Sequence, residues 1–184
     1  MPDRTYPAHP DIEKVLLTGP QIQARIAELG AQISRDYAGR SLIMVSILKG
    51  SVIFLGDLMR AVSVDCSVDF IGLSSYSGAK SSGVVRLTLD LRENPEGKDI
   101  LIVEDIVDTG LTIHYLMENL KTRGLRSLEV CTFLSKPECR KIEVPLKYVG
   151  FDIPNEFVVG FGLDYNEKFR NLPFVGVMRP NGGK

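Results

Sequence analysis

The sequence predicts an α/β domain with a mainly parallel central sheet flanked by helices. Short, nearly continuous apolar runs alternate with amphipathic helical segments, which is typical of strands covered by helices on both faces. The chain has 184 residues, of which 44% are apolar and 24% charged, as in an ordinary globular domain. We therefore expect one domain over residues 1–184, with an ordered core from about 16 to 178.

The first elements are a helix, a strand and a second helix. Thr18-Gly19-Pro20-Gln21 predicts a helix start, because it combines a capping threonine, an early proline and a glutamine three residues on. Helical spacing then extends this helix toward Gly39 through the apolar residues Ile22, Ile26, Leu29, Ile33 and Tyr37. The apolar run 41–48 predicts a buried strand, and 51–62 a helix.

The rest of the chain continues the alternation. Runs rich in Val, Ile and Leu predict strands at 64–74, 84–91, 100–103, 128–134, 147–151, 157–161 and 174–178. The small, polar segment 75–83 predicts a loop, and a turn at 108–110 opens a helix over 111–123, with Gly124 as its stop. In such sheets ligands bind beyond the carboxyl ends of the strands, so the four strand-to-loop junctions are the candidate positions for functional residues.

Composition argues against several classes of protein. The net charge is −1 and the pI about 6.1, so we expect no nucleic-acid partner. No apolar run reaches the roughly 18 residues that span a bilayer, and the polar N-terminus is no secretory signal, so no membrane partner is expected. Three cysteines without metal-ligand spacing and only two histidines argue against disulfides and zinc, and favour the cytoplasm.

The most informative junction is I-V-E-D-I-V-D-T-G-L-T, residues 102–112. An apolar strand runs into Glu104 and Asp105, then Asp108, then a small-residue turn that opens a helix. The amides of such a turn, with the helix dipole behind them, form a phosphate cradle. Three carboxylates would repel a bare phosphate, so they indicate a hard cation or a polyol among them. Alternatively, Asp108 caps the helix and the paired acids lie in a solvated loop.

The other junctions carry less information individually. Lys49-Gly50, after the first buried strand, offers a cation and exposed amides for a diphosphate, or is an ordinary turn. The 75–83 loop is a lid or a plain hairpin connection. Lys136 donates to a carbonyl oxygen or is a solvated surface lysine. Phe157 is a stacking platform or core, and Arg170 binds an anion or pairs with a nearby carboxylate.

Residues 102–112 closely resemble the phosphoribosyl-diphosphate fingerprint of type I phosphoribosyltransferases, and about 16–178 resembles their hypoxanthine-guanine phosphoribosyltransferase branch. The resemblance implies the type I fold, with a small base-binding hood from about 136–178 and a candidate N-terminal contribution. It implies purine salvage, in which the 5-phosphoribosyl group of phosphoribosyl diphosphate is transferred to N9 of hypoxanthine or guanine, giving IMP or GMP plus diphosphate. Xanthine is a further candidate base. It also implies a homodimer or homotetramer.

The resemblance assigns roles within the acidic junction. Glu104 and Asp105 would lie beside the ribose hydroxyls and a Mg²⁺ ion, and Asp164 beside a second Mg²⁺, so Mg²⁺ is the expected cofactor. Asp108 would be the catalytic residue that receives the N7 proton of the base. The 5′-phosphate would be held by the turn residues Asp108, Thr109, Gly110, Leu111 and Thr112.

Roles at the other junctions also follow from the resemblance. The diphosphate would be bound by Lys49, Gly50, Ser75, Tyr76 and Arg170. Ser75-Tyr76 would lie in the lid, and the Leu48–Lys49 peptide is expected to be cis. The base would be bound by Lys136 at O6, by Phe157 through stacking and by the main chain of Val158.

Two further expectations concern specificity and rival functions. A lysine only donates hydrogen bonds, so Lys136 suits the O6 atom of a 6-oxopurine and offers no acceptor to the amino group of adenine. A nucleic-acid-binding regulator and a phosphate-binding module without turnover are the rival classes. The chain has no basic arm, which argues against the first, and four junctions agree in order and spacing, which argues against the second.

Overall fold

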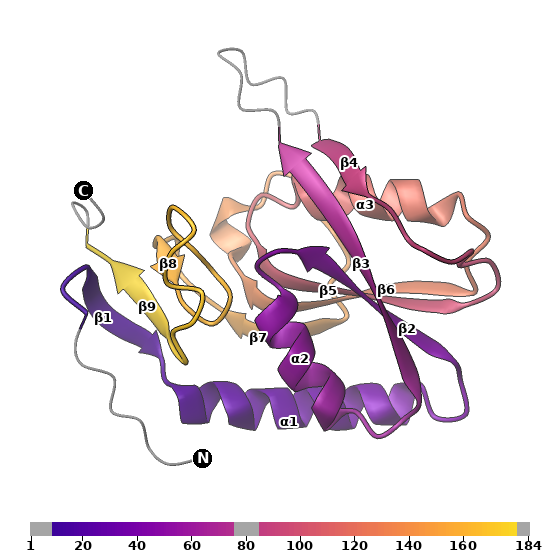
Figure 1. Cartoon of the computed structure of the whole chain (residues 1–184), viewed down its shortest axis with the longest axis horizontal. Coiled ribbons are helices and arrows are strands. Elements are labelled where there is room, and N and C mark those ends of the chain that lie inside the picture. The colour runs from indigo at the N-terminus through magenta and orange to yellow at the C-terminus, as the bar shows by residue number, and fades with distance from the viewer. Residues whose placement is uncertain (1–8, 76–84, 180–184) are drawn as a thin grey trace.

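The computed structural model describes residues 9–75 and 85–179, with the side chains of Ser75 and Val85 left undescribed (Figure 1). In chain order the elements are β1 (Ile12–Leu17), α1 (Gly19–Asp36), β2 (Leu42–Leu48), α2 (Val52–Ala61), β3 (Cys66–Ser75), β4 (Val85–Leu89), β5 (Asp99–Val107), α3 (Leu111–Lys121), β6 (Ser127–Ser135), the 3₁₀ helix η1 (Pro137–Cys139), β7 (Tyr148–Asp152), β8 (Val158–Val159) and β9 (Val175–Met178).

Six of the strands form a central sheet in the order β4-β3-β2-β5-β6-β7. All neighbours in it are parallel except β3 and β4, which confirms the predicted mainly parallel α/β architecture. The chain moves outward from β2 to β3 and β4, then from β5 to β6 and β7 on the other side. The winding therefore reverses between β2 and β5, and ligands of such sheets bind beyond the carboxyl ends of the strands at this point.

Apolar side chains fill both faces of the central sheet. In β2, Leu42 and Met44 belong to the core cluster that also holds buried residues of α1 and α2, whereas Ile43 and Val45 belong to the cluster of α3. Successive side chains of a strand point to opposite faces, so a strand covered on both sides has a continuous apolar sequence. Within the part of the chain that the structure describes, no helix is both long and apolar enough to cross a bilayer.

A second sheet of three antiparallel strands, in the order β1-β9-β8, lies beside the start of α1 (Figure 1). The sequence did not predict β1, because only Ile12 and Leu17, at its two ends, are buried and no alternation results. Its partner β9 lies about 160 residues away in sequence, with Ile12 opposite Met178. The N-terminal strand thus joins the two C-terminal strands into one small layer.

Helix α1 begins as predicted, and several boundaries differ from the expectation. The Thr18 amide donates to Gln21 Oε1 at 2.9 Å, and the helix ends at Asp36 instead of near Gly39. Strand β8 has two residues instead of five. Strand β5, expected to end at residue 103, runs to Val107. Its polar residues interrupt the apolar pattern without interrupting the backbone pairing with β6.

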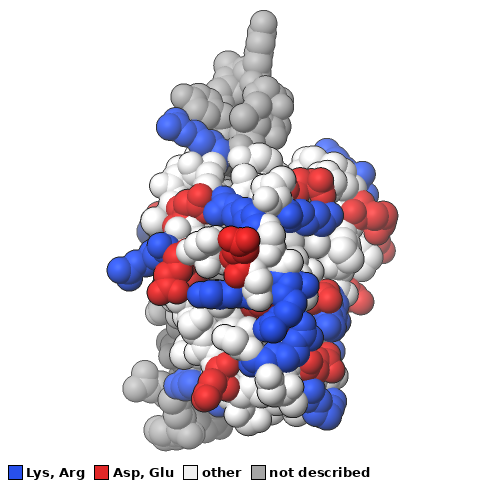
Figure 2. All heavy atoms as spheres, turned by 90° about the vertical axis from the view of Figure 1, so that its right-hand side faces the viewer, with Lys and Arg blue, Asp and Glu red and all other residues white. Residues whose placement is uncertain are grey.

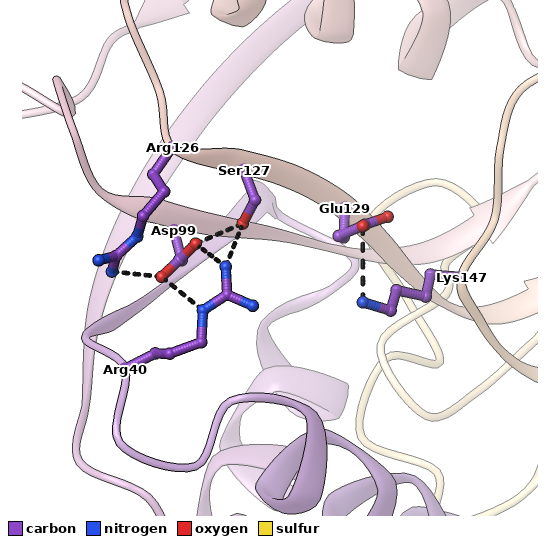
Figure 3. Close-up of polar contacts among 6 residues, drawn as sticks. All are labelled: Arg40, Asp99, Arg126, Ser127, Glu129 and Lys147. Carbon is purple, nitrogen blue, oxygen red and sulfur yellow. Dashed lines mark hydrogen bonds and ion pairs between the residues drawn. The ribbon is translucent and has the colours of Figure 1, made fainter.

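A buried carboxylate holds the edge at which the parallel strands begin. The side chain of Asp99, the first residue of β5, is fully buried and accepts hydrogen bonds from Arg40, Arg126 and Ser127 (Figure 3). Figure 2 shows this side of the molecule, where basic and acidic side chains are interspersed. Burial acts to raise the pKa of Asp99, but the hydrogen bonds from Arg126, Ser127 and Arg40 outweigh it and lower the pKa to about 2.

We predict that Asp99 makes stability depend on acid pH. Its pKa in the folded protein lies below the ordinary value of 3.8, so its contribution is complete above about pH 4 and is lost as the pH falls toward 2. In urea unfolding, Asp99→Asn should lower the free energy of unfolding at pH 7 by about 2 kcal/mol, and the difference from wild type should shrink at low pH. The control variant Glu13→Gln replaces an exposed carboxylate, and it should leave the free energy of unfolding unchanged both at pH 7 and at low pH. A deficit of Asp99→Asn that stays constant from pH 7 to pH 3 would contradict this role.

Candidate active site

The junctions after β2 and β5 meet at the point where the winding reverses. A Cβ atom placed on Gly50 would lie 1.7 Å from Oδ2 of Asp105, so the Asp105 carboxylate rests directly against the Gly50 backbone. A Cβ on Gly162 would lie 2.0 Å from the carbonyl oxygen of Gly50, so the loop after β8 closes on the same turn. The Leu48–Lys49 peptide is cis, which confirms that expectation. Three segments distant in sequence therefore touch through glycines.

The paired acids lie within β5, where Glu104 is buried and Asp105 is partly exposed. Glu104 is 7% exposed, and its Oε2 atom has no hydrogen-bond partner among the described residues. Burial, with the neighbouring charge of Asp105, raises the pKa of Glu104 well above its ordinary value. Burial also raises the pKa of Asp105 to about 6, although the Ile106 amide, which donates to Oδ1 at 2.9 Å, opposes the shift. The expectation that these acids could lie in a solvated loop is wrong.

The carboxylates of Glu104 and Asp105 would be more stable with a bound cation than without one. A carboxylate oxygen buried without a partner is unfavourable, and a divalent ion or a hydroxyl donor would satisfy it. Over residues 9–75 and 85–179, no three His, Cys, Asp or Glu side chains converge as a metal cage. Mg²⁺ does not require such a cage, because it commonly keeps its waters and binds one or two carboxylates together with substrate phosphates. Glu104 and Asp105 fit that kind of site.

The turn after β5 has the form of a phosphate cradle. Gly110, with φ of 85°, stands at the N-cap position of α3, and helix formation begins at Leu111 as predicted. The alternative in which Asp108 caps the helix is wrong, since Asp108 precedes the cap and is exposed. The turn borders a small cavity, whose lining residues are Glu104, Ile106, Val107, Asp108, Thr109, Gly110, Thr112 and Ile113. Glu104 and the residues of the turn thus line one cavity.

Lys136 follows β6 beside this turn. It is 7% exposed, so the alternative of a solvated surface lysine is wrong. Its amide donates to the carbonyl of Val107 at 3.0 Å, so this candidate base-binding residue is hydrogen-bonded to the last residue of β5. Pro137 then opens η1. Burial, and then the neighbouring carboxylate of Asp108, raise the pKa of the Cys139 thiol.

The two cations expected at the diphosphate are paired with acids of the loop between β8 and β9. Arg170 Nη2 lies 2.8 Å from Asp164 Oδ1 and 3.5 Å from Glu167 Oε1. Lys49 Nζ lies 3.0 Å from Glu167 Oε2, a contact between residues 118 apart that the sequence did not predict. The sequence left two alternatives for Arg170, anion binding or pairing with a nearby carboxylate, and the pairing is present in the structure. Both pairs are partly or largely exposed, so a diphosphate can compete for the cations.

Phe157 lies outside the core. Its side chain is 56% exposed and meets Tyr165 edge to face, with ring centroids 5.7 Å apart. The alternative in which Phe157 belongs to the core is therefore wrong, and its exposed ring is accessible to a planar ligand. Val158 is buried and pairs with Val177 of β9. Ser75 ends β3, its side chain is not described, and Tyr76 lies outside the described residues.

Comparison with known proteins gives consistent matches. Residues 14–166 match the family described as a phosphoribosyl transferase domain. A hypoxanthine-guanine phosphoribosyltransferase of Mycobacterium avium is 51% identical over 97% of this chain and 91% of its own. The solved structure of a hypoxanthine phosphoribosyltransferase from Staphylococcus aureus has a TM-score of 0.89 at 48% identity, over 92% of this chain and 93% of that one. The solved structure of a hypoxanthine phosphoribosyl transferase from Trypanosoma cruzi has a TM-score of 0.89 at 41% identity, over 95% of each chain.

We predict that Gly50 tolerates no side chain. Because a Cβ there would overlap the Asp105 carboxylate, Gly50→Ala should lower the free energy of unfolding by about 1–3 kcal/mol, as overpacking does. The matched control is Gly56→Ala in α2, where nothing lies within 4 Å of an added Cβ. This control should gain about 0.5–1 kcal/mol from helix propensity. Urea unfolding of both variants checks the prediction, and a Gly50→Ala protein as stable as wild type would refute it.

Proposed function

The chain belongs to the phosphoribosyltransferase family, and we propose that it catalyses purine salvage by transfer of a 5-phosphoribosyl group from phosphoribosyl diphosphate to a 6-oxopurine. N9 of hypoxanthine or guanine attacks the anomeric carbon of the ribose, and diphosphate leaves with the bonding electrons. The products are IMP or GMP and diphosphate. Relatives of about 50% identity that carry the name hypoxanthine-guanine phosphoribosyltransferase support this reaction.

One observation carries the assignment of the site. Glu104, whose Oε2 atom is buried without a partner among the described residues, and the turn that begins at Asp108 line the same cavity. A ribose 5-phosphate has hydroxyl donors at one end and phosphoryl acceptors at the other. The hydroxyls match the buried carboxylate, and the phosphoryl oxygens match the amides and threonine hydroxyls of the cradle.

The leaving group gains negative charge as the bond breaks, so catalysis requires cations and donors around the diphosphate. Glu104 and Asp105 are the residues that would hold Mg²⁺, with Asp164 as the candidate ligand of a second ion. When bound, Mg²⁺ would neutralise part of the diphosphate charge. The turn of Lys49 and Gly50 and the guanidinium of Arg170 supply the remaining donors. For Arg170 to bind the diphosphate, its pairing with Asp164 has to open.

Two groups around the base complete the proposed reaction. Asp108, which is exposed and lines the cavity, would receive the N7 proton of the attacking purine. Phe157 offers its open ring surface for stacking, and Val158 its main chain for the base edge. We assign the sheet β1-β9-β8 and the loop between β8 and β9 to the hood over the base. A lid formed by Ser75-Tyr76, a homodimer or homotetramer, and a cytoplasmic location, which the free cysteines favour, stay predictions.

We predict selectivity among bases from the chemistry of Lys136. In a spectrophotometric assay with phosphoribosyl diphosphate and Mg²⁺, hypoxanthine and guanine should turn over. Adenine should react roughly 1,000-fold or more slowly in kcat/KM, because its amino group meets a buried donor without an acceptor. Xanthine is the fourth base of the assay. Appreciable activity with adenine would remove the role given to Lys136.

We also predict that Asp108→Asn separates catalysis from binding. The amide keeps the shape of the side chain but cannot accept the N7 proton, so kcat should fall roughly 100-fold or more. The KM for phosphoribosyl diphosphate should change by no more than about threefold, because the cradle binds the phosphate through its backbone. Steady-state kinetics with both substrates varied checks this. A raised KM at unchanged kcat would mean that Asp108 binds substrate only.

A further inference from the structure

Three successive carbonyls of the phosphate turn accept hydrogen bonds from one segment, residues 136–142, here called the strap. In order, Lys136 N donates to Val107 O at 3.0 Å, Arg140 Nη1 to Asp108 O at 2.8 Å, and Lys141 N and Ile142 N to Thr109 O at 3.0 and 3.2 Å. The strap also packs closely on the turn, because a Cβ on Gly110 would lie 2.4 Å from the carbonyl oxygen of Ile142. The carbonyls of Val107, Asp108 and Thr109 are therefore all held by the same segment.

These bonds determine where the amides of the turn point. In a trans peptide the carbonyl and the following N–H point in opposite directions. Among the described residues the cis peptide is Leu48–Lys49, so the peptides of the turn are trans. With their carbonyls directed at the strap, the amides of Asp108, Thr109 and Gly110 are directed away from it. The strap thus aims three donors together, which is what an anion site requires.

Arg140 makes the one contact among these four that depends on a side chain, the other three donors being backbone amides. Its second nitrogen, Nη2, lies 3.0 Å from Oγ of Ser135, the last residue of β6 and 2% exposed. The planar guanidinium therefore joins the end of β6 to the carbonyl of Asp108. Such a fork fixes direction as well as distance, which a lysine in its place could not do.

We propose that Arg140 is a positioning residue for the 5′-phosphate site: without touching substrate, it orients the Asp108–Gly110 amides that bind the phosphate. The inference rests on the proposed function and adds to it. Without Arg140, the Asp108 carbonyl loses its partner and the peptide between Asp108 and Thr109 can rotate. Binding of the phosphate should then weaken. Lys136 should keep its place, because its own bond to Val107 is independent of the guanidinium.

The direct test measures binding of ribose 5-phosphate, which carries the phosphate and no base or diphosphate, by titration calorimetry. Arg140→Ala should raise Kd roughly tenfold or more. The control is Arg123→Ala, which removes the same charge from another partly buried arginine, one that bonds Asp90 and Asn119 at the end of α3. It should leave Kd within about twofold of wild type. If wild type binds no ribose 5-phosphate, the proposed function fails. If wild type and Arg140→Ala bind equally, this inference alone fails.

Chemical rescue separates positioning from general damage. Guanidinium ion at millimolar concentration, far below the molar range that unfolds proteins, should restore part of the affinity of Arg140→Ala for ribose 5-phosphate. It should not raise the affinity of wild type or of Arg123→Ala. Arg140→Lys should stay as weak as Arg140→Ala to within about threefold, since one ammonium cannot span both acceptors. Absence of rescue in a folded Arg140→Ala protein would overturn the proposal.

Ser135→Ala gives an independent variant should Arg140→Ala fail to fold. It leaves the guanidinium in place and removes its second anchor, so Kd should rise roughly threefold. In the double variant with Arg140→Lys the two losses should not add, because both act through the same fork. Fully additive losses, or an unchanged Kd in Ser135→Ala, would contradict the proposal.

Discussion

Glu104 keeps a carboxylate oxygen buried without a hydrogen-bond partner in residues 9–75 and 85–179, and the candidate site is built around this unfavourable group. A further carboxylate of β5, Asp99, lies at the start of the strand, and the contrast between Asp99 and Glu104 is informative. Asp99 is also buried but accepts hydrogen bonds from two arginines and a serine, so its charge is stabilised and its pKa lowered. Glu104 has no such partners, and burial raises its pKa. The protein itself thus supplies the hydrogen-bond donors for Asp99, whereas we propose that a ligand supplies the missing partner of Glu104.

Close backbone contact is what brings the parts of the site together. Gly50 admits the carboxylate of Asp105, Gly162 admits the carbonyl of Gly50, and Gly110 admits the carbonyl of Ile142. At each position an added methyl group would overlap an oxygen atom. The turn after β2, the end of β5, the strap and the loop after β8 therefore lie close together, and in the proposed site the phosphoryl, ribose and base would each meet a different one of these segments. These close contacts bring loops that are distant in sequence together at one place.

The sequence predicted the parts of the molecule that are determined locally. The apolar run of β2, the capped start of α1 and the turn that opens α3 follow from periodicity and turn chemistry, and the structure has them. It missed β1, whose burial depends on pairing with β9, and the last four residues of β5, whose pairing with β6 continues through polar side chains. The Lys49–Glu167 pair and the Phe157–Tyr165 contact depend on the loop after β8. There Phe161, Asn166, Glu167 and Phe169 adopt positive φ without being glycine, a shape set by tertiary contacts that no local pattern encodes.

The central claim is that residues 104–112 hold a ribose phosphate, with acids toward the sugar and metal and amides toward the phosphate. A crystal structure of the protein with GMP and Mg²⁺ tests it most directly. Density for the 5′-phosphate is expected within hydrogen-bond distance of the amides of residues 108–112, and density for the ribose hydroxyls beside Glu104 and Asp105. A nucleotide bound elsewhere, with that turn empty, would contradict it.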